Sequence, residues 1–264
     1  MMKLSIEAIL LAGLLLVGLV NSALAGPLPE RTADEEVIES GEADLLGRGT
    51  PQQVQLVGRK ADFGTFYRDV YLNIFDGETL VASQPLDKMS GYYGVRKALF
   101  FGDFTGDQVP EVFVSLATGG SGGLINYRLV TWRDEQGVLL FGAAQNRGLS
   151  CTLTSADDWR LQVRTEQGGA TLQLDGVVRR AEYRRLGYFD EQGKVLKPLP
   201  AFVAPFGWLE PEDRDGDGHY MLRGWQQLSG AYRADQIGWL ESVWRYEHDA
   251  WTILNVNLGQ RLMP

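Results

Sequence analysis

Short alternating runs of apolar and polar residues, separated by turn residues, fill most of the chain. Clear examples are residues 67–75, 126–132, 159–165 and 251–256. Because successive side chains of a strand point to opposite faces, these runs predict half-buried β-strands. After the amino-terminal segment, no stretch has apolar residues at a helical period over a helical length. We therefore expect one all-β domain over residues 51–264.

Turns of related sequence divide these strands at nearly even steps. The segments 131–140 and 187–196 share an Asp-Glu-Gln-Gly turn, and similar acidic turns occur near residues 76 and 249. The equivalent aspartates are Asp76, Asp134, Asp190 and Asp249, about 56 to 59 residues apart. This spacing is typical of propeller blades and similar arrays. We expect a propeller-like array of about four four-stranded units, with a β-sandwich as the alternative.

The amino terminus has the features of an export signal. Lys3 precedes an apolar run at 8–20, and Ala23-Leu24-Ala25 stands directly before Gly26. This pattern predicts a signal peptide over residues 1–25. The run is shorter than the roughly 18 to 20 residues that a membrane span needs, so we expect no transmembrane span after cleavage. The predicted location is secreted or periplasmic, in a bacterial envelope.

Residues 26–50 are strongly acidic. They contain seven acidic residues against Arg31 and Arg48, with few large apolar side chains. Such a segment buries too little surface to offset the entropy lost on ordering, so it predicts a disordered acidic leader. An amphipathic helix is the alternative. No basic patch in the sequence indicates a nucleic-acid or anionic-lipid partner.

Two acidic loops, at 103–111 and 213–220, place oxygen-bearing side chains at every second position around a glycine. Calcium is bound by oxygen ligands at this spacing. An EF-hand would need a glutamate at position 12, where the loops have Val114 and Gly224. The candidate ligands are Asp103, Thr105, Asp107 and Glu111 in the first loop, and Asp213, Asp215, Asp217 and the carbonyl of His219 in the second.

Both loops resemble the calcium loops of FG-GAP/VCBS-type repeats. The resemblance is strongest over residues 97–132 and 204–256, and it includes the turns at 118–123 and 229–232 that are similar to those of exported bacterial repeat proteins. It implies propeller-type blades and structural Ca²⁺, and it implies no particular activity. Thr105 and Met221 stand where the family pattern has better ligands, so each loop is one good ligand short.

Two classes of function fit the sequence. The first is an exported, calcium-stabilised β-repeat binding or envelope-associated module, whose ligand is a glycan or an envelope protein. Tryptophan and tyrosine residues crowd the last unit and could form its platform. The second is a secreted, glycosidase-like hydrolase that uses clustered carboxylates. No acidic pair stands out from the calcium candidates, so we expect a binding module and assign no catalytic residue.

Overall fold

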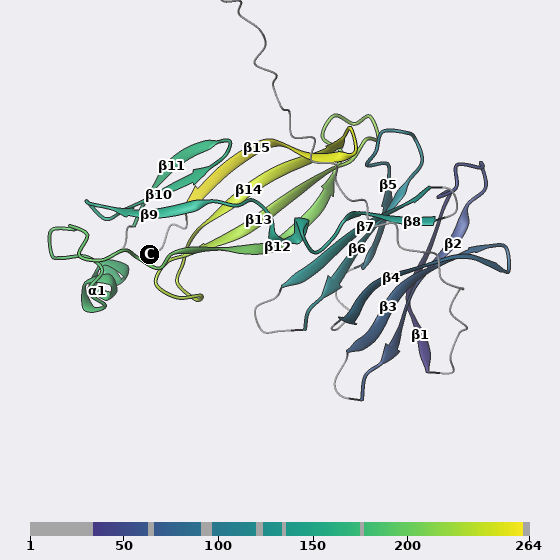
Figure 1. The fold of residues 1–264 in the computed structure, drawn as a ribbon, viewed down its shortest axis with the longest axis horizontal. Coiled ribbons are helices and arrows are strands. Elements are labelled where there is room, and N and C mark those ends of the chain that lie inside the picture. Colours follow the sequence, from purple (N-terminus) through teal and green to yellow (C-terminus); the bar gives the residue numbers. More distant parts are fainter. Residues whose placement is uncertain are drawn as a thin grey trace, which may run out of the picture.

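Four antiparallel sheets make up the protein in this computed structural model (Figure 1). The structure describes residues 34–62, 66–90, 97–119, 124–133, 136–174 and 177–260. In each sheet, strands that follow one another along the chain are hydrogen-bonded neighbours. The prediction of an all-β fold is therefore confirmed.

We number the sheets in chain order. The first contains β1 (Glu35–Ala43), β2 (Gln52–Lys60), β3 (Tyr67–Asp76) and β4 (Thr79–Ser90). The second contains β5 (Leu99–Gly102), β6 (Glu111–Ala117), β7 (Ile125–Arg133) and β8 (Gln136–Phe141). The short 3-10 helix η1 (Gln145–Arg147) leads to the third, with β9 (Thr152–Ala156), β10 (Arg160–Thr165) and β11 (Gly168–Gln173), followed by α1 (Val177–Arg185). The fourth contains β12 (Phe202–Glu212), β13 (Met221–Ser229), β14 (Gln236–Glu247) and β15 (Ala250–Gln260).

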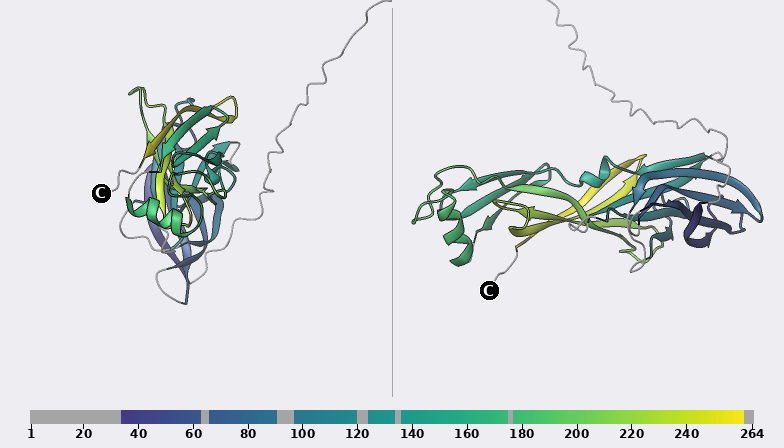
Figure 2. Two further views of the ribbon diagram at one scale, coloured as in Figure 1. Left: turned by 90° about the vertical axis from the view of Figure 1, so that its left-hand side faces the viewer. Right: turned by 90° about the horizontal axis from the view of Figure 1, so that it is seen from below.

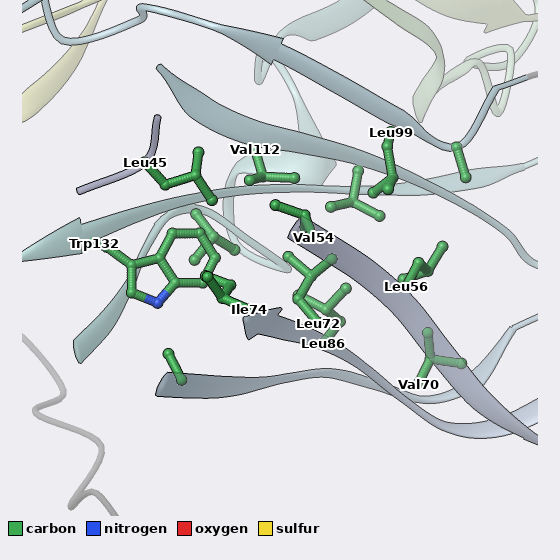
Figure 3. Close-up of a cluster of buried hydrophobic side chains, with 14 of the residues drawn as sticks. Leu45, Val54, Leu56, Val70, Leu72, Ile74, Leu86, Leu99, Val112 and Trp132 are labelled. Atoms are coloured by element: carbon green, nitrogen blue, oxygen red, sulfur yellow. The ribbon is translucent and has the colours of Figure 1, made fainter. Parts of the chain in front are cut away.

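The first and second sheets pack face to face. Leu56, Leu72 and Ile74 of the first sheet share a buried cluster with Val112 and Trp132 of the second (Figure 3). At the edges, β1 lies beside β5 and β4 lies beside β8. Two sheets that bury their apolar faces against each other in this way have a sandwich-like arrangement.

The fourth sheet is buried by two different neighbours. Leu209 and Leu222 share a cluster with Leu129 of the second sheet. Leu228 and Leu240 belong to another cluster, together with side chains of the third sheet and α1.

The sheets thus follow one another in space as first, second, fourth and third, in the elongated row seen in Figure 2. Among the described residues no sheet closes on itself, and a propeller ring is not shown. A sandwich-like arrangement fits this packing.

The chain crosses the fourth sheet on its way from the second sheet to the third. The buried side-chain amide of Gln226 accepts a hydrogen bond from the Leu149 N–H and donates to the carbonyls of Arg147 and Leu149. A Cβ at Gly148 would lie 2.4 Å from this amide, so the connection needs a glycine there. The crossing is therefore fixed by one buried polar side chain.

The predicted repeat can be compared with the observed hairpins. Asp76 ends the third strand of the first sheet at the hairpin to the fourth, and Asp249 lies in the corresponding hairpin of the fourth sheet. Position 134 falls between β7 and β8, but Asp134 itself lies outside the described residues. Asp190 occupies a short turn closed by the bridge between Phe189 and Val195, where the third sheet has no fourth strand.

The prediction of a disordered leader is wrong for residues 34–50. Strand β1 pairs with β2 along its whole length, and Leu45 is 1% exposed. The carboxylate of Glu39 accepts hydrogen bonds from the backbone N–H groups of Ala98 and Leu99. The acidic composition suggested disorder, but β1 is an edge strand. Acidic side chains at this edge can remain in water or pair with Arg59, as Asp34 and Glu35 do. Residues 26–33 and the predicted signal peptide lie outside the described residues.

Removing β1 provides a test of its structural role. A chain that begins at Pro51 loses Leu45 from the core and leaves the N–H groups of Ala98 and Leu99 without Glu39. We expect the midpoint of thermal unfolding to fall by about 10 °C or more. The control begins at Asp34 and keeps every described strand. Equal midpoints for the two chains would show that β1 contributes nothing to stability.

Candidate functional site

The two acidic loops lie side by side. The first connects β5 to β6, the second connects β12 to β13, and a parallel bridge joins Asp103 to His219. The Tyr220 N–H donates to the Asp103 carbonyl at 2.6 Å, and the His219 ring Nε2 lies 3.2 Å from the Phe104 carbonyl oxygen. The structure thus brings together two loops that the sequence presents as separate candidates, at the junction of the second and fourth sheets.

The first aspartate of each loop binds backbone N–H groups of its own loop. The Asp103 carboxylate accepts hydrogen bonds from Thr105, Gly106 and Gln108. The Asp213 carboxylate accepts hydrogen bonds from Gly216, Asp217 and Gly218. These bonds hold each turn in shape by satisfying donors that lie outside the sheet ladders.

Asp44 plays the same part between β1 and β2, which the sequence analysis missed. Its carboxylate accepts hydrogen bonds from the N–H groups of Arg48 and Gly49, at 2.9 and 2.6 Å. Asp44 stands about one repeat length before Asp103, so the spacing of the turns could have identified it.

Glu111 is buried inside the first loop. Its side chain accepts hydrogen bonds from the Phe104 N–H at 2.7 Å, from the Thr105 hydroxyl at 3.2 Å and from the Thr131 hydroxyl at 3.0 Å. Burial raises the pKa of the Glu111 carboxyl to about 7. The bonds from Phe104 and Thr131 lower that pKa, whereas the charges of Asp107 and Asp103 raise it further. Glu111 therefore acts as an acceptor within the core.

The remaining predicted ligands point to separate partners. Asp107 accepts a hydrogen bond from the Val109 N–H, and Asp217 accepts one from the His219 N–H. Asp215 forms an exposed ion pair with Arg245 at 3.3 Å. Within the described ranges, no group of three His, Cys, Asp or Glu side chains is placed to hold a metal ion. The assignment of the eight candidates as calcium ligands stays a prediction.

One face of the fourth sheet carries a row of polar and aromatic side chains. Trp208 of β12 lies opposite Trp225 of β13, which lies opposite Glu241 of β14, and Glu241 lies opposite Asn257 of β15. Since residues opposite each other in neighbouring strands share a face, the row crosses all four strands. Trp239 is on the same face, because it is two residues from Glu241. We call these five residues the tryptophan face.

Hydrogen bonds hold the tryptophan face in place. The Glu241 carboxylate accepts hydrogen bonds from Arg223, the Trp225 indole and Asn257, all at 3.0 to 3.1 Å. Burial pushes the pKa of Glu241 upward, but these bonds and the charge of Arg223 outweigh it and leave that pKa below its ordinary value. The guanidinium of Arg223 also lies 4.9 Å from the centre of the Trp225 ring. Glu241 is therefore an ionised acceptor.

Trp239 lies over backbone with no side chain beneath it. A Cβ at Gly259 would come within 2.2 Å of the Trp239 ring, so only glycine allows this close approach. The rings of Trp208, Trp225 and Trp239 are all half-buried, which leaves part of each indole in contact with solvent. The sequence analysis noted the aromatic residues of this unit, but only the strand register places these three on one face.

A separate cleft of about 380 Å³ lies between the third and fourth sheets. Its lining is formed by Val163, Thr165, Gln167, Gly168, Gly169, Ala170, Leu240, Leu254, Asn255, Val256 and Leu258. None of these side chains is ionisable, so the cleft offers no acid or base for hydrolysis.

Comparison with known proteins places the chain in a family. The "Uncharacterized protein YybI" of Bacillus subtilis (strain 168) is 30% identical over 211 residues, which is 80% of this chain and 79% of that protein. The chain belongs to the YybI family. The YybI C-terminal domain matches residues 149–259, which contain the third sheet, α1 and most of the fourth sheet. No solved structure matches the chain. The resemblance to FG-GAP/VCBS repeats is not tested by these matches and stays a prediction.

Within the matched residues 149–259, a buried polar contact joins α1 to the turn before β14 of the fourth sheet. Tyr183 of α1 donates a hydrogen bond to Asp235, and Arg179 forms an ion pair with Asp235 at 3.3 Å. Asp235 also accepts the Ala231 N–H from the turn at residues 229–232, which the sequence analysis had singled out. A Cβ at Gly230 would lie 2.1 Å from the Tyr183 hydroxyl, which explains the glycine. This turn therefore holds α1 against the fourth sheet.

Glu111 should make stability depend on pH. Its pKa is raised on folding, so its contribution is fully present below about pH 4.5 and is lost as pH rises through about 7. Glu111→Gln keeps an acceptor and removes the charge. We expect the variant to gain about 2 to 3 kcal/mol relative to wild type between pH 5 and pH 8.

Urea unfolding at the two pH values measures this change. Glu191→Gln, at an exposed carboxylate of a surface turn, is the matched control and should show no such gain. The assignment would be wrong if the free energy difference between Glu111→Gln and wild type were the same at both pH values.

Proposed function

We propose that the protein is an exported binding module that holds a glycan against the tryptophan face. The observation that carries the proposal is the row of Trp208, Trp225, Glu241 and Asn257 across four paired strands. Flat aromatic rings can stack on the apolar faces of sugar rings, while the carboxylate and the amide can bind hydroxyl groups. A sheet holds these groups in fixed positions, which lowers the entropy cost of binding.

The described carboxyl groups favour binding over hydrolysis. A glycosidase needs an acid with a raised pKa close to a second carboxylate and in contact with the substrate. Glu111 has the raised pKa but is 0% exposed, and Glu241 has a lowered pKa. The alternative of a glycosidase-like hydrolase therefore has no supporting observation in the described residues.

Export and an envelope location are part of this proposal. They rest on the predicted signal peptide at residues 1–25. Within the described ranges, no helix has the length and apolar character needed to cross a bilayer. An envelope protein is the alternative ligand for the tryptophan face, since protein interfaces are also rich in tryptophan.

We further infer that the four sheets derive from one repeated unit. Asp44, Asp103, Asp157 and Asp213 each lie in the connection between the first and second strands of their sheet. Three of them accept hydrogen bonds from their own loop, and Asp157 accepts the Val195 N–H instead. This recurrence supports an array of strand-loop-strand units, of which the third has lost its last strand.

Glycan binding can be tested on the chain that begins at Gly26. Affinity electrophoresis against soluble polysaccharides, with pull-down on insoluble ones, should identify a glycan that retards or retains the protein. Trp225→Ala and Trp239→Ala should each weaken binding about tenfold or more, since truncating a tryptophan at the centre of a binding surface costs about 2 kcal/mol or more. Tyr67→Ala, on the first sheet, is the control and should bind like wild type. Retention that is unchanged in both tryptophan variants would exclude the tryptophan face.

Calcium dependence is a separate proposal and has its own test. Asp213 shapes its loop, so its loss would destabilise the protein with or without metal. Asp215 forms an exposed ion pair with Arg245, worth about 0.5 kcal/mol or less. If Ca²⁺ binds the folded chain, it should raise the midpoint of thermal unfolding, and Asp215→Ala should abolish most of that rise. Asp107→Ala should have a smaller effect. A wild-type midpoint indifferent to calcium and to chelator would remove the proposal.

A further inference from the structure

The segment that contains α1 and the turn after it has a net charge opposite in sign to that of the whole chain. Residues 177–197 contain six basic and three acidic side chains, whereas the chain has a net charge of −9. Figure 1 shows α1 at the end farthest from the first sheet, and the right-hand view of Figure 2 agrees with this position. The sequence analysis found no basic patch, although these six basic residues follow one another closely in the sequence.

Basic side chains and one leucine are exposed at this end. Arg184, Lys194 and Lys197 are exposed, and the side chain of Arg185 is 71% exposed. Leu196, between the two lysines, is 61% exposed, the highest value among the large apolar side chains that the structure describes. We call Arg184, Arg185, Lys194, Leu196 and Lys197 the basic tip.

The turn that presents Leu196 is held by hydrogen bonds. The N–H groups of Leu196 and Lys197 both donate to the Tyr188 carbonyl, directly after α1. The ammonium group of Lys197 lies 4.4 Å from the centre of the Tyr188 ring. Helix and turn therefore present their charges as one surface, and Leu196 remains exposed without a covering residue.

Three of the acidic groups near the basic tip make contacts within the protein. Asp190 accepts hydrogen bonds from the N–H groups of Gln192 and Lys194, and Asp157 accepts the Val195 N–H. Glu182 accepts a hydrogen bond from the Tyr232 hydroxyl and pairs with Arg185. These carboxylates shape the turn and keep their charge, and Glu191 is exposed on the same turn, so residues 177–197 have an excess of three positive charges.

We propose that the basic tip docks the protein onto the surface of an anionic lipid bilayer. Lysine and arginine side chains are attracted to acidic headgroups, and an exposed leucine between them can enter the interfacial layer. A tip at the end of the long axis can approach a flat surface without hindrance from the other sheets. A nucleic acid is a poorer fit, because five residues at one end provide no extended track for a phosphate backbone. The proposal is independent of glycan binding, which uses the fourth sheet.

Vesicle flotation with the chain that begins at Gly26 tests the proposal. We expect the wild-type chain to float with vesicles of phosphatidylglycerol and phosphatidylcholine in equal parts, and not with pure phosphatidylcholine. Raising the salt from about 0.05 to 0.5 M should weaken binding at least tenfold, because ions screen the attraction. Failure of the wild type to prefer the anionic vesicles would overturn the proposal.

Two variants assign the binding to the basic tip. Replacing Arg184, Arg185, Lys194 and Lys197 together by Gln should weaken binding at least a hundredfold, at about fivefold for each charge. Leu196→Ser should weaken it about tenfold, which distinguishes insertion into lipid from attraction to a charged polymer. Circular dichroism and thermal unfolding verify that both variants are folded.

A matched control removes equal charge elsewhere. Lys60, Lys88, Lys97 and Arg214 are exposed residues of other sheets and loops, and their joint replacement by Gln should leave binding within about threefold of wild type. Equal losses in the two charge variants would show a general charge effect and overturn the assignment. Binding to inorganic polyphosphate but not to vesicles would also overturn it.

Discussion

Burial of the fourth sheet by two different neighbours is the constraint on which the rest of the structure depends. A meander of four strands is not stable alone unless one face is covered. Leu209 and Leu222 of this sheet meet the second sheet, and Leu228 and Leu240 meet the third sheet and α1. The adjacent acidic loops and the Gln226 crossing lie at the first of these contacts. With its inner face covered, the fourth sheet leaves the tryptophan face to solvent.

Much of the local structure could be predicted from the sequence, because strand alternation and turn residues act over short distances. The spacing of Asp76 and Asp249 correctly marked the last hairpin of two sheets. The arrangement of sheets could not be predicted, since it depends on which apolar faces meet across more than a hundred residues. Strand β1 was missed because its acidic composition suggests disorder. Pairing with β2 and the hydrogen bonds accepted by Glu39 order this segment instead.

The acidic loops show how one residue pattern can serve two physical purposes. Aspartates at alternate positions around a glycine are typical of calcium loops, but the same oxygens of Asp103 and Asp213 bind the backbone of a tight turn. The spacing of these side chains in the sequence does not show whether their oxygens will bind a cation or backbone N–H groups. The tryptophan face was more accessible to prediction, because Trp239 and Glu241 share a strand face by alternation alone. Its composition across four strands required the observed register.

The position of the fourth sheet has a consequence for biosynthesis. It is formed by the last part of the chain, yet it lies between the second and third sheets, which are made earlier. Until its strands leave the ribosome, or emerge on the far side of a translocation channel, the clusters that contain Phe113 of the second sheet and Leu161 of the third lack the apolar side chains of the fourth sheet. Premature termination would leave two exposed apolar surfaces on one polypeptide. Chaperones and proteases act on chains that expose such surfaces.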